Sequence, residues 1–341
     1  MKCSVIVATY NRRNELRELL ESLEKQTLPR EHFEVVIVDD GSTDGTQEWL
    51  REHEKESSLH LHFLQQENAG PAAARNRGMK EASGDFFIFI DSDCIAPPNW
   101  LERIQHTVTT ERLDAFGGPD EARADFPPLL KAINYSMTSF LSTGGMRGKS
   151  GVKLATYYPR SFNMGVTKEV YEQVGGFSNL RFGEDIEFSS RILGSGAKVE
   201  FLPDAFVYHK RRTSIRQFFK QVFNMGVTRI LLFKKRPQNL EPLHGLPALA
   251  VVFVVTLSIF ALFSEGAGEF WLVCFLAYLA VILSGGIAAG LRYKNLTVGG
   301  LTPIVITIQI LGYGLGFLSG VLNLLILRDD SYVGYTKTYY H

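Results

Sequence analysis

The carboxyl-terminal third of this 341-residue chain is almost devoid of charge, which limits what the chain can fold into. Residues 241–341 hold only nine charged side chains, and uncharged stretches run over 246–263, 270–291 and 295–327. A helix that crosses a bilayer needs about 20 apolar residues. We therefore expect transmembrane helices at about 246–263, 270–291 and 301–327. Three buried helices of a soluble domain are the alternative, but they would need a far larger core.

The third uncharged stretch has 33 residues, too many for one upright helix and too few for two. Pro303 and the glycines after it predict a tilted or kinked helix, or an interfacial segment that leads into the span. Lysine and arginine flank the first span at 234–236 and follow the second at 292–294, whereas the loop at 264–269 carries only acids. The positive-inside rule then predicts a cytoplasmic amino-terminal region. It also puts the tail, 329–341, on the far side of the membrane.

The first 240 residues alternate between short apolar runs and stretches with helical spacing of leucine and alanine. The pattern predicts strands at 5–7, 35–38, 61–64 and 86–90, and helices at 14–25, 46–56 and 72–82. Repeated strand-helix units are typical of an α/β domain with a mostly parallel sheet and helices on both faces. Ligands of such sheets bind beyond the carboxyl ends of the strands.

Polar clusters follow three of the predicted strands. They are Thr9-Tyr10-Asn11-Arg12, Asp39 to Asp44, and Asp91-Ser92-Asp93. Alternation along an extended chain points Asp91 and Asp93 in the same direction. An Asp-x-Asp triplet also occurs in ordinary polar turns, but two carboxylates at a strand end suit a divalent cation and a phosphate. We therefore expect a metal-assisted phosphate site.

Several other classes of protein are disfavoured. The first turn lacks the Gly-x-Gly-x-x-Gly of dinucleotide-binding proteins, and the turn at 41–46 lacks the Gly-Lys-Ser/Thr ending of a P-loop. A formal net charge of zero gives no support for nucleic-acid binding. Cys3, Cys94 and Cys274 have neither disulfide nor zinc spacing, so we expect a reducing compartment. Residues 1–8 are too short and too weakly charged for a signal peptide.

Five motifs in order resemble those of the family 2 glycosyltransferases with the GT-A fold. They are Val5 to Asn11, Val36 to Asp44, Asn68 to Asn76, Asp91-Ser92-Asp93 and Gly183-Glu184-Asp185. The resemblance covers about the first 230 residues, and beyond them only a general likeness to membrane-anchored members remains. It implies a GT-A catalytic domain with a Rossmann-like mixed sheet over residues 1–212, followed by an all-α transmembrane region.

The resemblance implies a nucleotide-diphospho-sugar donor and a Mg²⁺ or Mn²⁺ cofactor. Asp39 would accept a hydrogen bond from the base, and Asp93 would bind the metal while Asp91 contacts the ribose or the sugar. Arg75 would contact a phosphate, or else form a structural salt bridge to an aspartate. The full set on the donor side is Thr9, Tyr10, Asn11, Arg12, Asp39, Asn68, Gly70, Arg75, Asp91, Ser92 and Asp93. For Ser42, Thr43 and Asp44 a solvated turn and helix cap is a real alternative.

By the same resemblance, Asp185 is the catalytic base of an inverting transfer, and His209 completes the metal shell. Each has a plainer alternative, which is a helix cap for Glu184 or Asp185 and, for His209, a surface position near lipid headgroups beside three cations. Residues expected on the acceptor or diphosphate side are Glu184, Arg211, Arg212, Gln217 and Gln221.

Residues 213–240 predict an amphipathic helix at the membrane interface or beside the acceptor, followed by the spans in 241–328 and the tail. Residues 126–140 predict a second interfacial or acceptor-facing helix, or a plain core helix, and 144–151 a mobile loop. The whole pattern favours a membrane-anchored inverting glycosyltransferase that extends a lipid-linked or growing glycan in cell-envelope, exopolysaccharide or glycoconjugate synthesis.

Two alternatives remain open. One is a polyprenyl-phosphate sugar synthase of the same fold, whose acceptor is already ionised and needs no base. The other is a non-catalytic membrane scaffold that binds nucleotide sugar, although no acidic motif position is missing. The spans contain no internal charged residue that would mark a transport pathway. The sequence does not indicate the sugar, the linkage or the oligomeric state.

Overall fold

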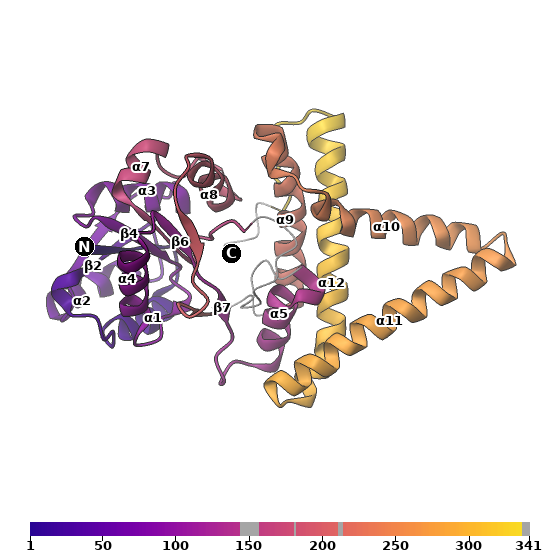
Figure 1. The fold of residues 1–341 in the computed structure, drawn as a ribbon, viewed down its shortest axis with the longest axis horizontal. Helices are drawn as coiled ribbons and strands as arrows, with labels where there is room; N and C mark the ends of the chain where they lie inside the picture. The colour runs from indigo at the N-terminus through magenta and orange to yellow at the C-terminus, as the bar shows by residue number, and fades with distance from the viewer. Residues whose placement is uncertain (144–156, 181, 211–213, 336–341) are drawn as a thin grey trace. The chain divides into compact units, whose positions relative to one another are not determined.

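The computed structural model describes residues 1–143, 157–180, 182–210 and 214–335. The chain folds into two compact units, which are described separately (Figure 1). The α/β unit comprises Met1–Arg123 and Tyr157–Lys210, and the helical unit comprises Ala124–Thr156 and Arg211–His341. The sequence predicts one boundary near residue 212. The structure differs in that Ala124–Thr156 belongs to the helical unit, because its helix packs there.

The α/β unit is built on a seven-stranded mixed sheet in the order β3-β2-β1-β4-β8-β6-β9. The first four strands of the chain run parallel, as their helical crossovers require. Strand β8 runs antiparallel to both of its neighbours, β4 and β6. The strands are β1 (Cys3–Thr9), β2 (Phe33–Asp39), β3 (Leu61–Gln65), β4 (Phe86–Ile90), β6 (Ala115–Gly117), β8 (Asn163–Thr167) and β9 (Val199–Phe201).

Helices cover both faces of this sheet. One core contains buried leucines of α1 (Arg13–Leu23) and α2 (Thr46–Glu56) and the apolar side of α4 (Trp100–Glu111). The core on the other face receives α3 (Pro71–Glu81), α7 (Lys168–Val174) and α8 (Glu184–Gly194). Alternate residues of β1 and β4 divide between the two cores, as the two-residue period of a strand dictates. A short 3₁₀ turn, Arg30–His32, precedes β2.

A second sheet of three very short strands lies in the same unit, in the order β5-β10-β7. Its strands are β5 (Cys94–Ile95), β7 (Asp120–Glu121) and β10 (Val207–His209). Strand β10 pairs antiparallel with β5, which places His209 opposite Cys94, and parallel with β7, which places Val207 opposite Asp120. This sheet brings together residues from three distant parts of the chain.

The helical unit contains six helices among its described residues. They are α5 (Pro128–Thr138), α6 (Phe140–Thr143), α9 (Ile215–Lys235), α10 (Pro242–Ala261), α11 (Glu265–Tyr293) and α12 (Leu296–Gly320), with a 3₁₀ turn at Pro237–Asn239 and a π-helical turn at Val321–Ile326. The core of this unit joins α5, α9, α11 and α12, with Ile133, Phe218, Ala289 and Val305 among its buried members. The helix predicted over 126–140 is therefore largely α5, whose apolar face is packed in a core.

Three helices of this unit are long and apolar enough to cross a membrane: Pro242–Ala261, Glu265–Tyr293 and Leu296–Ile326. The third continues through Pro303 without a break. The helix predicted within 213–240 is α9, and its exposed residues lie only at its two ends. The residues between them are buried or half-buried.

Candidate active site

Thr9 and Asp39 lie side by side at the carboxyl ends of β1 and β2, where the strands pair in register. The Asp39 carboxylate is fully buried, and its Oδ2 atom accepts hydrogen bonds from the Ser42 backbone N–H (3.0 Å) and from Gln47 Nε2 (2.7 Å). Asp39 Oδ1 and Thr9 Oγ1 are also buried but have no partner among the described residues. Buried polar atoms without partners destabilise a fold. Asp39 Oδ1 is therefore suited to accept a hydrogen bond from a ligand, and the Thr9 hydroxyl is suited to donate or accept one.

The residues after β1 are fixed by the loop after β2. Asn11 has the positive φ of 51°, its backbone N–H donates to Ser42 Oγ (2.8 Å), and its Oδ1 accepts from the Thr43 N–H (2.8 Å). The Asp44 carboxylate accepts from Thr46 and from the Arg13 N–H. Burial would raise the pKa of Asp44, but these hydrogen bonds outweigh it and lower the pKa. Ser42, Thr43 and Asp44 thus hold the turn.

Asp40 positions the segment that contains Asn68 and Gly70. Its carboxylate accepts hydrogen bonds from the backbone N–H groups of Ala69 (2.9 Å) and Gly70 (2.8 Å), and its carbonyl oxygen accepts from Asn68 Nδ2 (3.0 Å). Gly70 has a φ of 90° and comes directly before α3, so a residue with a side chain would be strained there. The small-residue motif at 68–76 therefore begins at a fixed turn below the strand ends.

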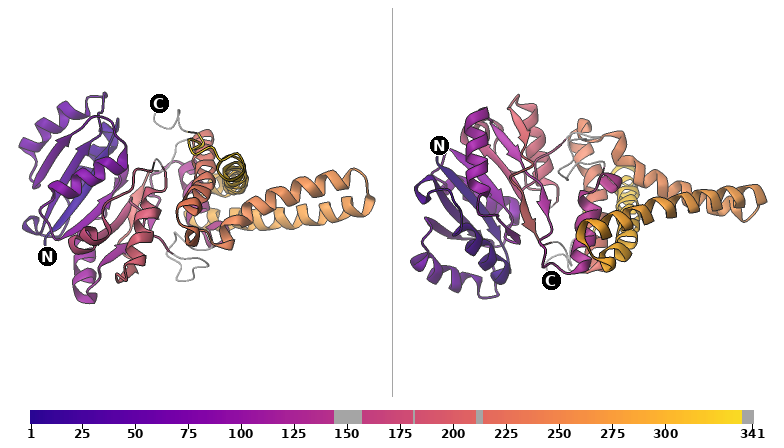
Figure 2. Two further views of the ribbon diagram at one scale, coloured as in Figure 1. Left: turned by 90° about the horizontal axis from the view of Figure 1, so that it is seen from above. Right: turned by 60° about the horizontal axis from the view of Figure 1, so that its bottom comes forward.

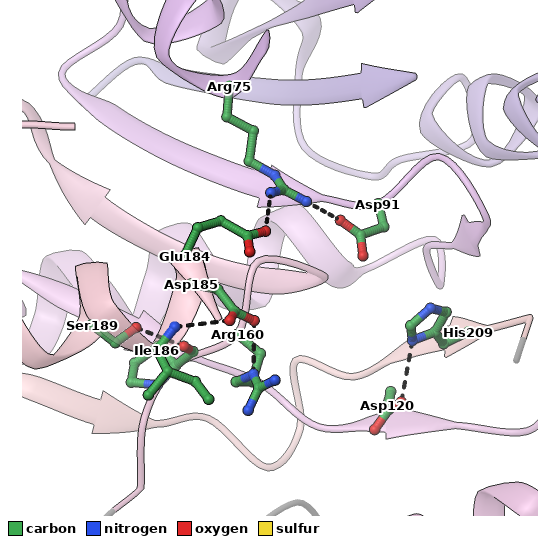
Figure 3. A network of polar contacts seen from close by, with 10 residues as sticks. Arg75, Asp91, Asp120, Arg160, Glu184, Asp185, Ile186, Ser189 and His209 are labelled. Atoms are coloured by element: carbon green, nitrogen blue, oxygen red, sulfur yellow. Dashed lines mark hydrogen bonds and ion pairs between the residues drawn. The ribbon is translucent and has the colours of Figure 1, made fainter. Parts of the chain in front are cut away.

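Asp93 and His209 meet beside the second sheet. Asp93 Oδ1 lies 3.2 Å from His209 Nε2. Asp120 Oδ2 lies 3.3 Å from His209 Nδ1 on the other side of the ring (Figure 3). Two neighbouring ligands of an octahedral ion with bonds of about 2.1 Å lie about 3 Å apart. The Asp93–His209 pair fits that geometry. Carboxylate and imidazole also suit Mn²⁺ or Mg²⁺ chemically.

His209 is largely buried and packs against the Phe162 ring at 5.3 Å between centroids, so it is not a residue of the exposed surface. Burial would lower its pKa, but Asp93 and Asp120 outweigh burial and raise the pKa to about 9. The thiol of Cys94 lies in the same cluster. Burial and the nearby carboxylates raise the pKa of Cys94, which keeps it a neutral thiol and a poor ligand for a hard cation.

Arg12 and Ser92 complete the strand-end group. Arg12 Nη1 lies 3.8 Å from Asp93 Oδ2 and 3.3 Å from Glu15 Oε1, and Ser92 is buried between the two aspartates of its triplet. Tyr10 stands between Thr9 and Asn11 in the same loop. The structure therefore places the Arg12 guanidinium within reach of the Asp93 carboxylate.

Arg75 joins two carboxylates that lie far apart in the sequence. Its Nη2 donates to Asp91 Oδ1 (2.8 Å) and its Nη1 to Glu184 Oε1 (3.0 Å), as Figure 3 shows. Burial would lower the pKa of Arg75, but Asp91 and Glu184 outweigh it and raise the pKa. The guanidinium also lies 5.5 Å from the Phe177 ring centre. Arg75 thus forms the structural salt bridge that the sequence left as an alternative to a phosphate contact.

Glu184 and Asp185 begin α8, directly after Gly183, whose φ is 78°. Asp185 Oδ2 accepts a hydrogen bond from Arg160 Nε (2.7 Å), and its Oδ1 accepts from the Ile186 N–H (2.8 Å). Burial and the adjacent Asp185 raise the pKa of Glu184 to about 7, although Arg75 opposes them. One acid of this motif is thus paired with Arg75 and the other with Arg160.

Two residues of the site lie outside the sequence motifs: Asp120 supports His209, and Arg160 supports Asp185. They lie 89 and 25 residues from their partners, so no local pattern joins them. Asp40 lies within the motif at 36–44, and its support of the turn before α3 was not expected. The local signal for Asp120 is weak: it is a polar residue that comes soon after the short apolar run 115–118.

The residues expected on the acceptor side belong to other parts of the chain. Gln217 and Gln221 lie on the first turns of α9, in the helical unit. Arg211 and Arg212, together with the whole loop predicted at 144–151, lie outside the described residues.

Comparison with known proteins agrees with this geometry. A family model described as glycosyl transferase family 2 matches residues 4–174. Glycosyltransferase AglE of Haloferax volcanii is 30% identical over 224 residues, which are 65% of this chain and 71% of that protein. A dolichyl N-acetyl-alpha-D-glucosaminyl phosphate 3-beta-D-2,3-diacetamido-2,3-dideoxy-beta-D-glucuronosyltransferase of Methanococcus voltae is 25% identical, covering 75% of this chain and 83% of that protein.

Among solved structures, the mannosyltransferase PcManGT of Pyrobaculum calidifontis, in complex with GDP-Man and Mn²⁺, has a TM-score of 0.61 and 21% sequence identity. The match covers 91% of this chain and 87% of that one. It shows the fold, and the GT-A architecture expected from the motifs is confirmed. The chain is a glycosyltransferase that belongs to glycosyl transferase family 2.

Proposed function

We propose that this protein is a membrane-anchored, metal-dependent, inverting glycosyltransferase that uses a nucleotide-diphospho-sugar donor. The observation that carries the proposal is the arrangement of the strand ends. Thr9 and Asp39 carry unpartnered buried oxygens at the ends of β1 and β2, and Asp93, which pairs with His209, follows β4 of the same parallel sheet. A nucleoside and a diphosphate joined to a sugar need both of these features.

Asp39 Oδ1 would accept an N–H of the base, while Thr9, Tyr10, Asn11 and Arg12 would line the nucleoside. Asn68 and Gly70 would support it from the turn that Asp40 holds. The solved relative PcManGT carries GDP-Man and Mn²⁺, which supports a nucleotide-sugar donor and a divalent metal here as well.

Asp93 and His209 would hold the Mg²⁺ or Mn²⁺ ion, with Asp120 fixing the ring of His209. When bound, the ion neutralises the charge of the departing nucleoside diphosphate. Asp91, held by Arg75, would face the ribose or the sugar, and Ser92 spaces the two carboxylates. Arg12 adds a positive charge on the same side of Asp93.

Asp185 would take the proton of the acceptor hydroxyl as the new bond to the sugar forms, which is general-base catalysis. A single displacement of this kind inverts the configuration at the sugar carbon. Arg160 supports the role because it binds one carboxylate oxygen and fixes the direction of the other. The hydroxyl acceptor would be a lipid-linked or growing glycan, and a need for a base disfavours a polyprenyl-phosphate acceptor.

The apolar helices of the carboxyl-terminal third would anchor the enzyme in the plasma membrane, with the α/β unit in the cytoplasm. Relatives that extend lipid-linked sugars, such as the Methanococcus voltae protein, support such an acceptor. The acceptor or the diphosphate would be contacted by Gln217, Gln221, Arg211 and Arg212.

The test is a screen of nucleotide sugars for release of the nucleoside diphosphate by the full chain in detergent, with Mn²⁺ or with a chelator. We expect cleavage that needs Mn²⁺ and is lost in Asp93→Ala. Glu169→Gln, an exposed acid of α7, is the matched control and should behave as the wild type. Equal cleavage by the wild type and Asp93→Ala, or none with any donor, would overturn the proposal; the second result would favour a non-catalytic scaffold.

A further inference from the structure

The carboxyl-terminal tail returns to α9 after α12 has ended. Lys234, near the end of α9, forms an ion pair with Asp330. The buried Asn224 side chain, nearly three turns earlier in α9, pairs with both backbone groups of Tyr335: its Oδ1 accepts from the N–H (2.8 Å) and its Nδ2 donates to the carbonyl (3.1 Å). Tyr332 and Ser319 also share a hydrogen bond of 2.6 Å. The tail is thus fixed along α9 at several points.

Helices α9 and α12 run side by side in the same direction. A Cβ atom on Gly312 would meet Val222, one on Gly316 would overlap the Phe223 carbonyl, and one on Gly320 would meet Ile230. The contact positions rise together in both helices, so the helices are parallel. Residues 312–320 of α12 therefore lie level with residues 222–230 of α9.

This pairing conflicts with a third crossing. If α10, α11 and α12 all crossed the bilayer, Lys234 before the first crossing and Asp330 after the third would lie on opposite faces. Those faces are separated by about 30 Å of hydrocarbon. An ion pair between the two side chains requires both to be on one face.

Helix α9 is itself unsuited to cross with α12. It carries Lys220 and Arg229 within its length and Lys234 and Lys235 at its end, and it is not among the helices apolar enough to span. A charged side chain at the bilayer centre costs about 3 kcal/mol or more. Because α12 packs alongside α9 in the same direction, both helices should lie at the membrane surface.

The other two helices are suited to cross. In Figure 1, α10 and α11 leave α12 and meet at a distant tip, and in Figure 2 α12 is seen nearly end-on while α10 and α11 extend sideways. The 20 residues of α10 give about 30 Å of helix, and the 29 of α11 about 44 Å, which spans when tilted. Acids lie at the tip and Lys234, Lys235, Arg292 and Lys294 at the open end, as the positive-inside rule requires of a hairpin.

We infer that only the α10–α11 hairpin crosses the membrane, and that α12 lies along its surface and binds lipid there. The inference rests on the membrane anchoring proposed above. The exposed residues of α12 and of the π-helical turn after it support it because the large ones form one apolar stripe: Leu296, Ile304, Leu311, Leu315, Leu322 and Ile326. That stripe faces the acyl chains, while α5 and α9 cover other sides of the helix. The tail and the α/β unit then share one face of the membrane, which replaces the far-side tail expected from the sequence.

Single cysteines in the full chain test this topology. Gly266→Cys marks the hairpin tip, Ser331→Cys the tail and Lys235→Cys the end of α9, and all three positions are exposed. The background is Cys274→Ala, since Cys3 and Cys94 are buried. A membrane-impermeant maleimide is added to intact bacterial cells and, separately, to lysed cells.

We expect Gly266→Cys to react in intact cells, and Ser331→Cys and Lys235→Cys only after lysis. Reaction of Ser331→Cys in intact cells would overturn the inference by showing a third crossing, and protection of Gly266→Cys until lysis would overturn it by removing the hairpin. Neither result touches the chemistry proposed above. Release of the whole chain by an alkaline wash would instead refute the membrane anchor itself.

Discussion

Asp91 and Glu184 share the guanidinium of Arg75, and His209 is held between Asp93 and Asp120. The candidate site therefore consists of charged pairs that are buried together. Such pairs are sensitive to the loss of one partner, because the other charge is left without compensation. Single substitutions that remove one partner should have effects well beyond those of surface changes.

Asp120→Asn should weaken metal binding. The Asp120 carboxylate can only accept from His209 Nδ1, which leaves Nε2 directed at Asp93, whereas an amide can also donate and does not fix the ring in this way. Mn²⁺ affinity, measured by electron paramagnetic resonance of the free ion, should fall about 10- to 100-fold. Asp120→Glu should recover part of the loss. Unchanged affinity in Asp120→Asn would show that the carboxylate has no such role.

Glu184→Gln should alter the pH profile of transfer. The pKa of Glu184 is raised to about 7, so its charge appears as the pH rises through that value. The charged form completes the pair with Arg75 and makes the adjacent Asp185 a stronger proton acceptor. Wild-type kcat/KM should therefore rise with pH near 7. In Glu184→Gln that rise should be lost, and an identical profile in the two proteins would contradict the assignment.

Sequence motifs identified most residues of the site but not the pairs between them. Arg75 could equally be read as a phosphate ligand, because its partners, Asp91 after β4 and Glu184 at the start of α8, lie 16 and 109 residues away. Arg160 and Asp120 carry no motif. Their roles depend on tertiary contacts that no local spacing encodes.

At the scale of elements, the parallel part of the sheet followed from apolar runs and helical leucine spacing. Strands β5, β7 and β10 have only two or three residues, too few for a period to be seen. The sequence pattern also did not predict the antiparallel strand β8, since residues 163–167 show no alternation of polar and apolar residues. Strands β5, β7 and β10 are the elements that bring Cys94, Asp120 and His209 together.

Glu34 stabilises the end of the sheet opposite the site. It accepts hydrogen bonds from Ser4, Ser83 and Lys2. Burial would raise its pKa, but these bonds outweigh it and lower the pKa to about 2. A carboxylate with a lowered pKa stabilises the fold above its unfolded pKa of about 4.3 and loses that effect as the pH falls towards 2.

Glu34→Gln should therefore reduce the free energy of unfolding by about 2–3 kcal/mol at pH 7, and by much less near pH 2. Urea unfolding of the full chain in detergent at both pH values measures this. Glu169→Gln serves as the exposed control. A loss of equal size at both pH values would contradict the assignment.

Gly316→Ala should disturb the packing of α9 against α12, because its Cβ would overlap the Phe223 carbonyl. We expect a loss of about 1–3 kcal/mol in the free energy of unfolding. Gly300→Ala is the matched control: it lies in the same helix, and nothing is within 4 Å of its Cβ position. It should be neutral or stabilising by up to about 1 kcal/mol. Equal effects of the two substitutions would argue against close packing of these helices.

At the scale of the whole molecule, composition alone separated an α/β region from an apolar region. It could not show that residues 124–143 pack with the carboxyl-terminal helices, because a mid-chain helix carries no sign of its distant partners. Nor could it show the direction of α12 relative to α9, which depends on the contacts of Gly312, Gly316 and Gly320. Both arrangements concern the anchor and not the chemistry.

In the proposed mechanism, Asp185 deprotonates the acceptor while Asp93 and His209 hold the metal and donor. The rate of sugar transfer by Asp185→Asn at saturating donor and Mn²⁺ tests this mechanism most directly. We expect a rate at least about 10²-fold below wild type, with Mn²⁺-dependent nucleotide binding retained, because the amide still accepts from Arg160 but cannot take a proton. A wild-type rate of transfer in Asp185→Asn would contradict it.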